Sequence, residues 1–315
     1  MKVVALAGGV GGARLADGLR RVLPGEDLTV IVNTADDFEH LGLHISPDVD
    51  TVTYTLAGVE NPETGWGRAD ESWSFLETLA RLGGPTWFRL GDRDLAVHVQ
   101  RTAWLASGMP LSAVTRRIAE SFGIGPSLLP MSDDPVRTIV RCTEGELAFQ
   151  EYFVARGCQP PVRGFRFEGA ARARPAPGVL VSLADAEAVL LAPSNPWVSL
   201  DPILAVPGIG EQLRSKPVVG VSPIVGGRAL KGPAAKMARE LGLSVSPATI
   251  AAHFRSVLTG FVLDTADAGA AEAIERTGVP TRVANTIMRD GDSRAELATA
   301  MLDLARELAT GRIGR

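Results

Sequence analysis

The stretch "KVVALAGGVGGARLADGLRRVLPGEDLTVIVN", residues 2–33, decides the fold. Residues 2–7 and 28–33 are short apolar runs of the kind that form buried strands. The residues between them place apolar side chains at helical spacing, at Leu15, Leu19 and Val22. A strand, a helix and a second strand of this length make a βαβ unit, in which the two strands run parallel. Because both strands are apolar throughout rather than alternating, we expect a sheet that is covered on both faces.

Further apolar runs follow at intervals that leave room for helices between them, at 187–192, 217–221, 260–264 and, more weakly, 281–285. This alternation of strands and helices is typical of a doubly wound, Rossmann-like α/β fold with a mainly parallel sheet.

Three segments depart from this alternation. Residues 51–125 show helical periodicity between Gly and Pro residues, which predicts a mainly helical segment. Residues 136–168 alternate like antiparallel strands and predict a small β excursion with a hairpin around 144–145. Residues 292–311 predict an amphipathic closing helix. We expect all of these segments to belong to one Rossmann-like domain that spans residues 1–315.

Composition narrows the class of protein. The chain has 315 residues, of which 45% are hydrophobic and 22% charged, as in globular proteins. Because its net charge is −4, we expect no binding to nucleic acid. Cys142 and Cys158 stand far apart, which favours reduced thiols over a disulfide or a zinc knuckle. The apolar run at the N-terminus is too short for a secretion signal or a membrane span. We therefore expect a cytoplasmic protein with no membrane partner.

The glycine loop between the first strand and the first helix predicts an anion site. Glycine occupies positions 8, 9, 11 and 12. Without Cβ atoms, backbone N–H groups can approach an anion at the positive end of a helix. A dinucleotide fingerprint is disfavoured because Arg14 stands where a third small residue is needed, and no Gly-Lys-Ser/Thr marks a P-loop. The competing interpretation is a tight turn that binds no ligand.

An acidic segment follows the second strand, where open α/β sheets bind their ligands. The stretch "TADDFEHLGLHISPDVD", residues 34–50, contains Asp36, Asp37, Glu39, His40, His44, Asp48 and Asp50. Oxygen-rich ligands favour magnesium. His40 and His44 would suit zinc on a helix, but Gly42 and the Ser46-Pro47 pair argue against a continuous helix there. The alternative is that Asp36, Ser46 or Asp48 caps a helix.

Other predicted loops contain polar residues that suit the recognition of a phosphate or a nucleoside. A predicted turn at 88–98 carries Arg89, and the loops 128–138, 191–204 and 221–236 carry Ser132 and Asp133, Ser194 and Asn195, and Lys231 respectively. No Ser-His-Asp arrangement or nucleophile elbow is present. This inventory favours metal-assisted transfer at phosphorus over a covalent intermediate.

Seven motifs, in register along nearly the whole chain, are similar to one known family. AGGVGGAR, NTADD, SPDVDT, LGDRD, PMSDDPV, PSNP and VSPIVG together resemble the 2-phospho-L-lactate transferase family of deazaflavin coenzyme F-420 biosynthesis. The resemblance implies a Rossmann-like transferase. It would move a phospholactyl-type group from a GDP-activated donor to the ribityl hydroxyl of 7,8-didemethyl-8-hydroxy-5-deazariboflavin and release GMP, with Mg²⁺ as cofactor.

The resemblance also implies roles for individual residues. Asp50 and Arg89 would contact the deazaflavin, and Asp50 would orient or deprotonate the attacking hydroxyl. Mg²⁺ would be held by some of Asp36, Asp37, Asp48 and Asp50. The donor and its nucleotide would be bound by Gly8, Gly9, Gly11, Gly12, Asn33, Ser132, Asp133, Ser194 and Asn195. A homodimer is expected on the same basis.

Two questions stay open at this stage. The glycine loop reads GGVGGAR where archaeal members look more like GGTGTPK, which resembles the actinobacterial branch and leaves phosphoenolpyruvate, phospholactate and phosphoglycerate as donor acids. The alternative function is a non-catalytic regulator that binds a nucleotide sugar, because a related bacterial family resembles this chain in its glycine loop and ADD segment. SPDVDT and LGDRD favour the transferase, since an acceptor site would need them.

Overall fold

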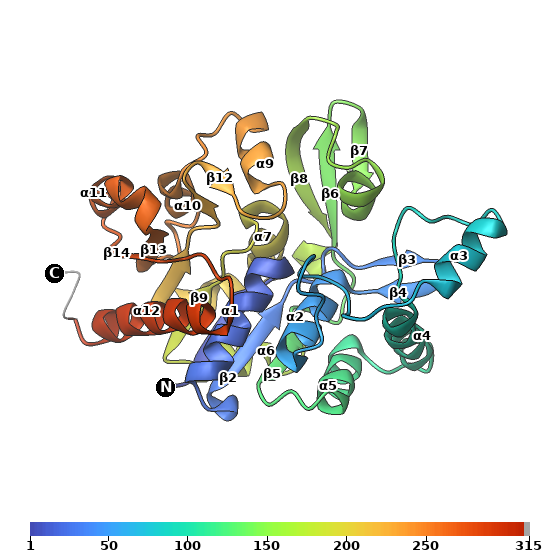
Figure 1. Cartoon of the computed structure of the whole chain (residues 1–315). Helices are drawn as coiled ribbons and strands as arrows, with labels where there is room; N and C mark the ends of the chain where they lie inside the picture. The colour runs from blue at the N-terminus through green and yellow to red at the C-terminus, as the bar shows by residue number, and fades with distance from the viewer. Residues whose placement is uncertain (312–315) are drawn as a thin grey trace.

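The computed structural model describes residues 1–311 and is built around a seven-stranded sheet in the order β14-β13-β10-β9-β1-β2-β5 (Figure 1). All neighbouring strands are parallel. This confirms the predicted Rossmann-like α/β fold. The strands are β1 (Val3–Ala7), β2 (Leu28–Val32), β5 (Ser127–Pro130), β9 (Ala188–Leu191), β10 (Val218–Val221), β13 (Gly260–Asp264) and β14 (Thr281–Ala284).

Helices cover both faces of this sheet, as its continuously apolar strands predict. Side chains alternate along β1, so that Val3, Ala5 and Ala7 pack into one core and Val4 and Leu6 into the other. On the first face lie α1 (Gly9–Val22), α2 (Pro47–Ala57) and α12 (Gly291–Ala309). On the second lie α6 (Val179–Asp185), α8 (Ile209–Leu213) and α10 (Pro247–His253).

Six of the seven strands lie within one residue of their predicted bounds. The exception is β5, which the sequence analysis took as part of a polar loop. It is an edge strand of four residues that ends in Pro130 and pairs only with β2. A proline is tolerated at such an edge, but its presence weakens the strand pattern.

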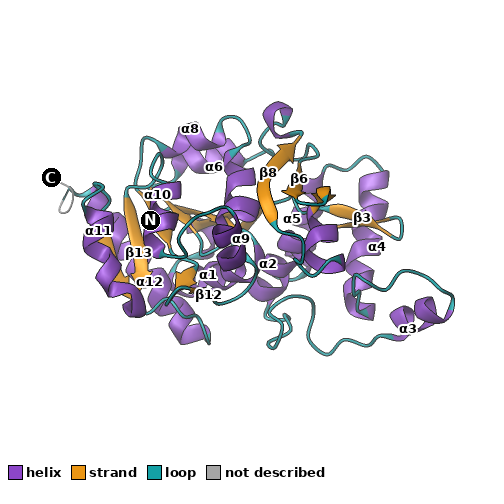
Figure 2. Ribbon diagram, turned by 90° about the horizontal axis from the view of Figure 1, so that it is seen from above, coloured by secondary structure: helices purple, strands orange, loops and turns teal. Residues whose placement is uncertain are grey.

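The predicted helical segment is confirmed and lies at one end of the sheet. It contains α2, α3 (Ser74–Arg81), α4 (Asp92–Ala106) and α5 (Leu111–Ser121). The turn predicted at 88–98 is wrong over most of its length, because α4 begins at Asp92 directly after Gly91. A short hairpin, β3 (Phe38–His40) and β4 (Leu43–Ile45), packs against α4, and α3 extends outward on long loops (Figure 2).

The predicted β excursion is also confirmed. It is a three-stranded antiparallel sheet of β6 (Arg137–Cys142), β7 (Gly145–Ala148) and β8 (Val162–Glu168), with β6 in the centre. Two residues connect β6 to β7, which is the predicted hairpin. The strand pattern predicted over 136–168 is interrupted, because Glu151–Ala155 form a π-helical turn.

The remaining elements are short. They are a two-stranded hairpin, three helices, three 3-10 turns and a second π-helical turn: β11 (Ile224–Val225), β12 (Arg228–Ala229), α7 (Asp201–Leu204), α9 (Ala234–Glu240), α11 (Ala271–Glu275), Gly25–Asp27, Ala170–Arg172, Thr265–Ala270 and Pro196–Leu200. Within residues 1–311, no helix has both the length and the apolar character needed to cross a membrane.

Candidate active site

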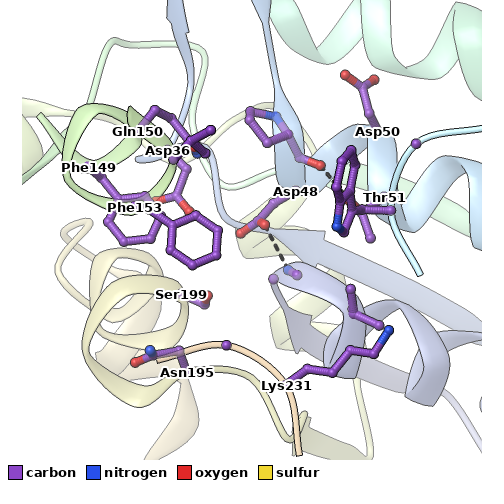
Figure 3. A pocket seen from close by; sticks show the side chains of 18 of the residues that line it. Asp36, Asp48, Asp50, Thr51, Phe149, Gln150, Phe153, Asn195, Ser199 and Lys231 are labelled. Carbon is purple, nitrogen blue, oxygen red and sulfur yellow. Dashed lines mark hydrogen bonds between the residues drawn. The ribbon is translucent and has the colours of Figure 1, made fainter. Parts of the chain in front are cut away.

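A cavity of about 650 Å³ opens where β1 lies between β9 and β2, at the carboxyl ends of these strands. The strand order changes direction at this point, and open α/β sheets bind their ligands there. The walls come from segments spread over more than two hundred residues (Figure 3). Of the predicted site residues, the cavity is lined by Gly8, Gly9, Gly11, Asp36, Asp48, Asp50, Arg89, Ser194 and Asn195.

The glycine loop allows a close approach between α1 and two other segments. A Cβ atom on Gly8 would lie 2.5 Å from a carboxylate oxygen of Asp48, and one on Gly11 would lie 2.4 Å from the carbonyl oxygen of Pro193. α1 begins at Gly9, so the N–H groups of Val10 and Gly11 have no intrahelical acceptor. Since both residues line the cavity, these N–H groups are available to an anion.

Asp48 lies against the start of α1. Its carboxylate accepts hydrogen bonds from the Gly9 N–H, at 2.8 Å, and from the side chain of Asn33, at 2.9 Å. The helix-capping alternative for this residue is wrong, because Asp48 belongs to the first turn of α2 and contacts α1 instead. A negative charge therefore already lies at the anion site that the sequence predicts.

Asp36 and Asp37 complete a buried acidic group with Asp48. Burial, followed by the charge of Asp48, raises the pKa of Asp36 well above its usual range. Burial also raises the pKa of Asp48 to about 6, against the hydrogen bonds from Asn33 and Gly9. The Oδ1 atoms of Asp36 and Asp37 are buried without a hydrogen-bond partner. Carboxylates that repel one another and keep some oxygens without a partner fit a hard divalent cation.

The zinc alternative is not supported by the backbone. His40 and His44 lie on the antiparallel hairpin β3–β4, not on a helix, and are not paired across it. Leu41 and Gly42 form its turn and both have positive φ angles. Ser46 precedes α2, but its hydroxyl makes no capping bond and donates to Asp37 instead. As predicted from Gly42, no continuous helix forms between His40 and His44.

Asp50 belongs to a second buried network, between α2 and α4. Both of its carboxylate oxygens accept hydrogen bonds from the fully buried guanidinium of Arg101. On the same side, His98 Nε2 lies 3.2 Å from Asp94 Oδ1, which also accepts the hydroxyl of Tyr54 at 2.5 Å. Ligand atoms of Asp50, Asp94 and His98 lie within 4.8 Å of one another, an arrangement compatible with a divalent metal.

Burial and ion pairing act in opposite directions within this network. Burial raises the pKa of Asp50, although the charges of Arg101 and His98 oppose the change. Burial also acts to raise the pKa of Asp94, but hydrogen bonding to His98 and Tyr54 outweighs it, so that this pKa is lowered. In contrast to the group around Asp48, Asp50 already has a cationic partner in Arg101.

Aromatic side chains form two further walls of the cavity. Trp87 and Phe88 contact each other and the rings of Phe38 and His40 edge to face or tilted. On another wall, Phe149 and Phe153 stack with 5.4 Å between ring centroids. Such surfaces suit a flat, partly apolar ligand. Sequence reasoning missed these residues, although aromatic side chains clustered among Gly and Pro residues at 84–88 were a usable signal.

The remaining predicted residues have varied positions. The guanidinium of Arg89 lies 4.2 Å from the ring centre of Trp73. Ser194 bridges to the glycine loop by accepting the Gly8 N–H at 3.1 Å. The residues that do not line the cavity are Gly12, Asn33, Asp37, Ser132 and Asp133. Of these, Ser132 donates to the carbonyl of Arg174, and Asp133 accepts from the backbone and side chain of Ser112.

The fold and the cavity thus define an α/β protein with a glycine loop and an acidic group at one sheet edge. Comparison with known proteins is consistent with this class. The family model of 2-phospho-L-lactate transferase CofD matches residues 3–298. A phosphoenolpyruvate transferase from Streptomyces griseus subsp. griseus is 46% identical over 98% of this chain and 99% of its own length. A 2-phospho-L-lactate transferase from Methanosarcina mazei is 38% identical over 94% and 98%.

The chain therefore belongs to the 2-phospho-L-lactate transferase CofD family, and it is an enzyme of the transferase class. This confirms the resemblance seen in the motifs. A crystal structure of a UPF0052 family protein from Bacillus halodurans has a similar fold, with a TM-score of 0.62 over 96% of this chain and 99% of that one, but only 16% sequence identity. That likeness extends to the fold alone.

Proposed function

We propose that this enzyme transfers a phospholactyl-type group from a GDP-activated three-carbon acid to a deazaflavin, 7,8-didemethyl-8-hydroxy-5-deazariboflavin, in coenzyme F-420 biosynthesis. The observation that carries the proposal is that Gly11 and Asp50 line the same cavity. The glycine loop suits a diphosphate, and the aromatic walls suit a flat ring system, so both substrates have a surface of fitting chemistry.

The reaction needs no covalent enzyme intermediate. The terminal ribityl oxygen forms a bond to the phosphorus that carries the three-carbon acid. The bond from that phosphorus to the bridging oxygen breaks, and GMP leaves with the electron pair. The proton of the hydroxyl passes to a base. Asp50 lines the cavity and would orient the hydroxyl or accept its proton. The pairing with Arg101 fixes the position of the Asp50 carboxylate.

A divalent cation fits the acidic group beside the glycine loop. A diphosphate at the start of α1 would meet the carboxylate of Asp48, and two anions at this distance repel each other. Asp36 and Asp48 would hold Mg²⁺ there, and the ion would neutralise charge on the diphosphate. We place the ion at these residues rather than at Asp50, because Arg101 already binds both oxygens of Asp50.

Three acids remain candidates for the donor: phosphoenolpyruvate, phospholactate and phosphoglycerate. Similarity to phosphoenolpyruvate transferases supports the first, because the relative from Streptomyces griseus subsp. griseus is 46% identical and the archaeal one 38%. The homodimer expected from the family resemblance is also a proposal, and sedimentation analysis of the purified protein measures it directly.

Turnover with defined substrates tests the function. The purified protein is incubated with Mg²⁺, the deazaflavin and each of the three GDP-activated acids, and the products are separated by mass spectrometry. We expect the phosphodiester of the deazaflavin and GMP in equal amounts, with the fastest turnover for the phosphoenolpyruvyl donor. Saturable binding of GDP and deazaflavin without any product from the three donors would instead indicate a non-catalytic binding protein.

A further inference from the structure

Lys231 holds two loops together at the rim of the cavity. It follows the hairpin β11–β12, in the segment that sequence analysis singled out as a polar loop at the end of a strand. Its ammonium donates to the carbonyl oxygen of Thr64, at 2.6 Å, and to that of Glu63, at 3.4 Å. These carbonyls belong to a loop that is far away in the sequence but borders the same cavity.

The two loops meet beside the start of α1. Gly65 has a positive φ angle, and a Cβ atom at this position would lie 2.7 Å from the side chain of Val10 and 3.2 Å from the ammonium of Lys231. Val10 is part of the glycine loop. Lys231 therefore lies on the same side of the cavity as the free N–H groups of α1, and Figure 3 shows its side chain extending along this wall.

The ammonium of Lys231 has no anionic partner among residues 1–311. No carboxylate oxygen lies within 4.0 Å, and both of its hydrogen bonds go to neutral carbonyl groups. Burial, followed by the nearby charge of Arg14, lowers the pKa of this amine. Hydrogen bonds between an ammonium and an anion are stronger than those to carbonyls, so a phosphate oxygen would compete well for this group.

The cavity is lined by more acidic than basic side chains, so an anionic ligand needs a cation such as Lys231 to bind there. Its lining carries four carboxylates, those of Asp36, Asp48, Asp50 and Asp94. The other permanently charged cation in the lining is Arg89, which belongs to the loop before α4. Its guanidinium lies over the ring of Trp73. Asp36, which lines this cavity, also has one buried oxygen without a hydrogen-bond partner, as expected near a site for a charged ligand and its counterion.

We propose that Lys231 binds the diphosphate of the donor beside the glycine loop, exchanging the carbonyl groups of Glu63 and Thr64 for phosphate oxygens. The inference rests on the proposed function and adds a binding residue to it. Before the donor arrives, the two carbonyls hold the ammonium at the rim of the site.

Isothermal titration calorimetry with GDP and, separately, with inorganic pyrophosphate tests this role, both in the presence of Mg²⁺. Lys231→Gln keeps a neutral donor for the carbonyls but removes the charge, whereas Lys231→Arg keeps the charge. We expect Lys231→Gln to weaken both ligands by roughly tenfold to a hundredfold and Lys231→Arg by less than about fivefold. Lys2→Gln, which removes an exposed lysine remote from the cavity, controls for net charge and should bind like the wild type.

The outcomes separate this inference from the proposed function. If the wild type binds GDP and Lys231→Gln binds it equally well, Lys231 is only a structural contact and the inference is overturned while the function stands. If the wild type binds pyrophosphate in a Lys231-dependent way but not GDP, Lys231 is a diphosphate ligand and the GDP donor is wrong. If neither ligand binds the wild type, both proposals fail. Thermal unfolding of each variant confirms that the protein is folded.

Discussion

At the scale of single residues, the sequence indicates which residues share the cavity but not which partners the carboxylates contact. Gly8, Gly9 and Gly11 and the aspartates at 36, 48 and 50 line one cavity, because the ends of parallel strands meet at one sheet edge. The partners of these carboxylates are not predictable in the same way. Arg101 is 51 residues from Asp50 in the sequence, and nothing local in the chain shows that α4 packs its buried face against α2.

Asp50 is the residue on which the proposed chemistry depends most. We expect Asp50→Asn to lower turnover by at least about 100-fold, since the amide oxygen can accept a hydrogen bond but cannot take up the hydroxyl proton. GDP affinity should stay within about twofold, because the glycine loop lies on another wall. Asp303→Asn, at an exposed pair with Arg306, is the matched control. Full turnover in Asp50→Asn would remove this residue from the mechanism.

Asp50→Asn also leaves the buried Arg101 without its anion, so stability must be measured beside turnover. Loss of one partner of a buried pair costs about 3 kcal/mol. A variant that unfolds at a lower temperature but is folded under assay conditions still tests the chemistry. The additional exchange Arg101→Met removes the unpaired cation and should restore part of the stability but none of the turnover.

At the scale of elements, periodicity predicts which segments are helices and strands but not which of them touch. α1 and α12 are both predicted, yet the ion pairs that join them are not. Asp17 is buried in α1 and accepts hydrogen bonds from Arg20 and Arg21 on its own helix and from Arg294 on α12. Similarly, β5 and the start of α4 were not predicted, because β5 is short and α4 begins inside a polar motif.

Asp17→Asn should show how much the ion pairs of Asp17 contribute to stability. We expect a loss of about 2 kcal/mol in the free energy of unfolding at pH 7, because three charged hydrogen bonds weaken together. Burial acts to raise the pKa of Asp17, but the three arginines outweigh it and lower the pKa below 3.8. Stability from this carboxylate is therefore present above pH 4 and lost as the pH falls further.

Urea unfolding at a series of pH values checks this prediction. The difference between the wild type and Asp17→Asn should be constant from about pH 5 to 7 and shrink below pH 4. Asp303→Asn serves again as a control, since its partner Arg306 is half exposed and such surface pairs contribute little. A difference that does not change with pH would mean that packing, and not charge, accounts for the loss.

At the scale of the whole molecule, the cavity is assembled from segments that no local pattern connects. The sheet edge supplies the glycine loop, the helical segment supplies Asp50 and Trp87, and the β excursion supplies Phe149 and Phe153. A doubly wound, mainly parallel sheet could be expected from the sequence, and with it a site at the carboxyl ends of the strands. The aromatic walls could not, because they depend on where two excursions fold back over the sheet. That the entire chain forms one domain stays a prediction.

This assembly predicts how magnesium and pH together control stability. The folded pKa of Asp48 is about 6, and that of Asp36 is also raised, whereas both are near 3.8 in an unfolded chain. The folded state therefore binds more protons than the unfolded state at intermediate pH. Without metal, these two carboxylates destabilise the protein above pH 6, and their cost disappears as the pH falls towards 4.

Mg²⁺ should reverse this cost, because it binds the ionised carboxylates of the folded chain and competes with protons. We expect millimolar MgCl₂ to raise the melting temperature clearly at pH 7.5 and much less at pH 5.5, relative to EDTA. Asp36→Asn should melt higher than the wild type in EDTA and gain less from Mg²⁺, whereas the exposed Asp185→Asn should behave like the wild type. Differential scanning calorimetry at the two pH values measures all of these. An equal gain at both pH values, or an undiminished gain in Asp36→Asn, would place the ion elsewhere, with Asp50, Asp94 and His98 as the next residues to exchange.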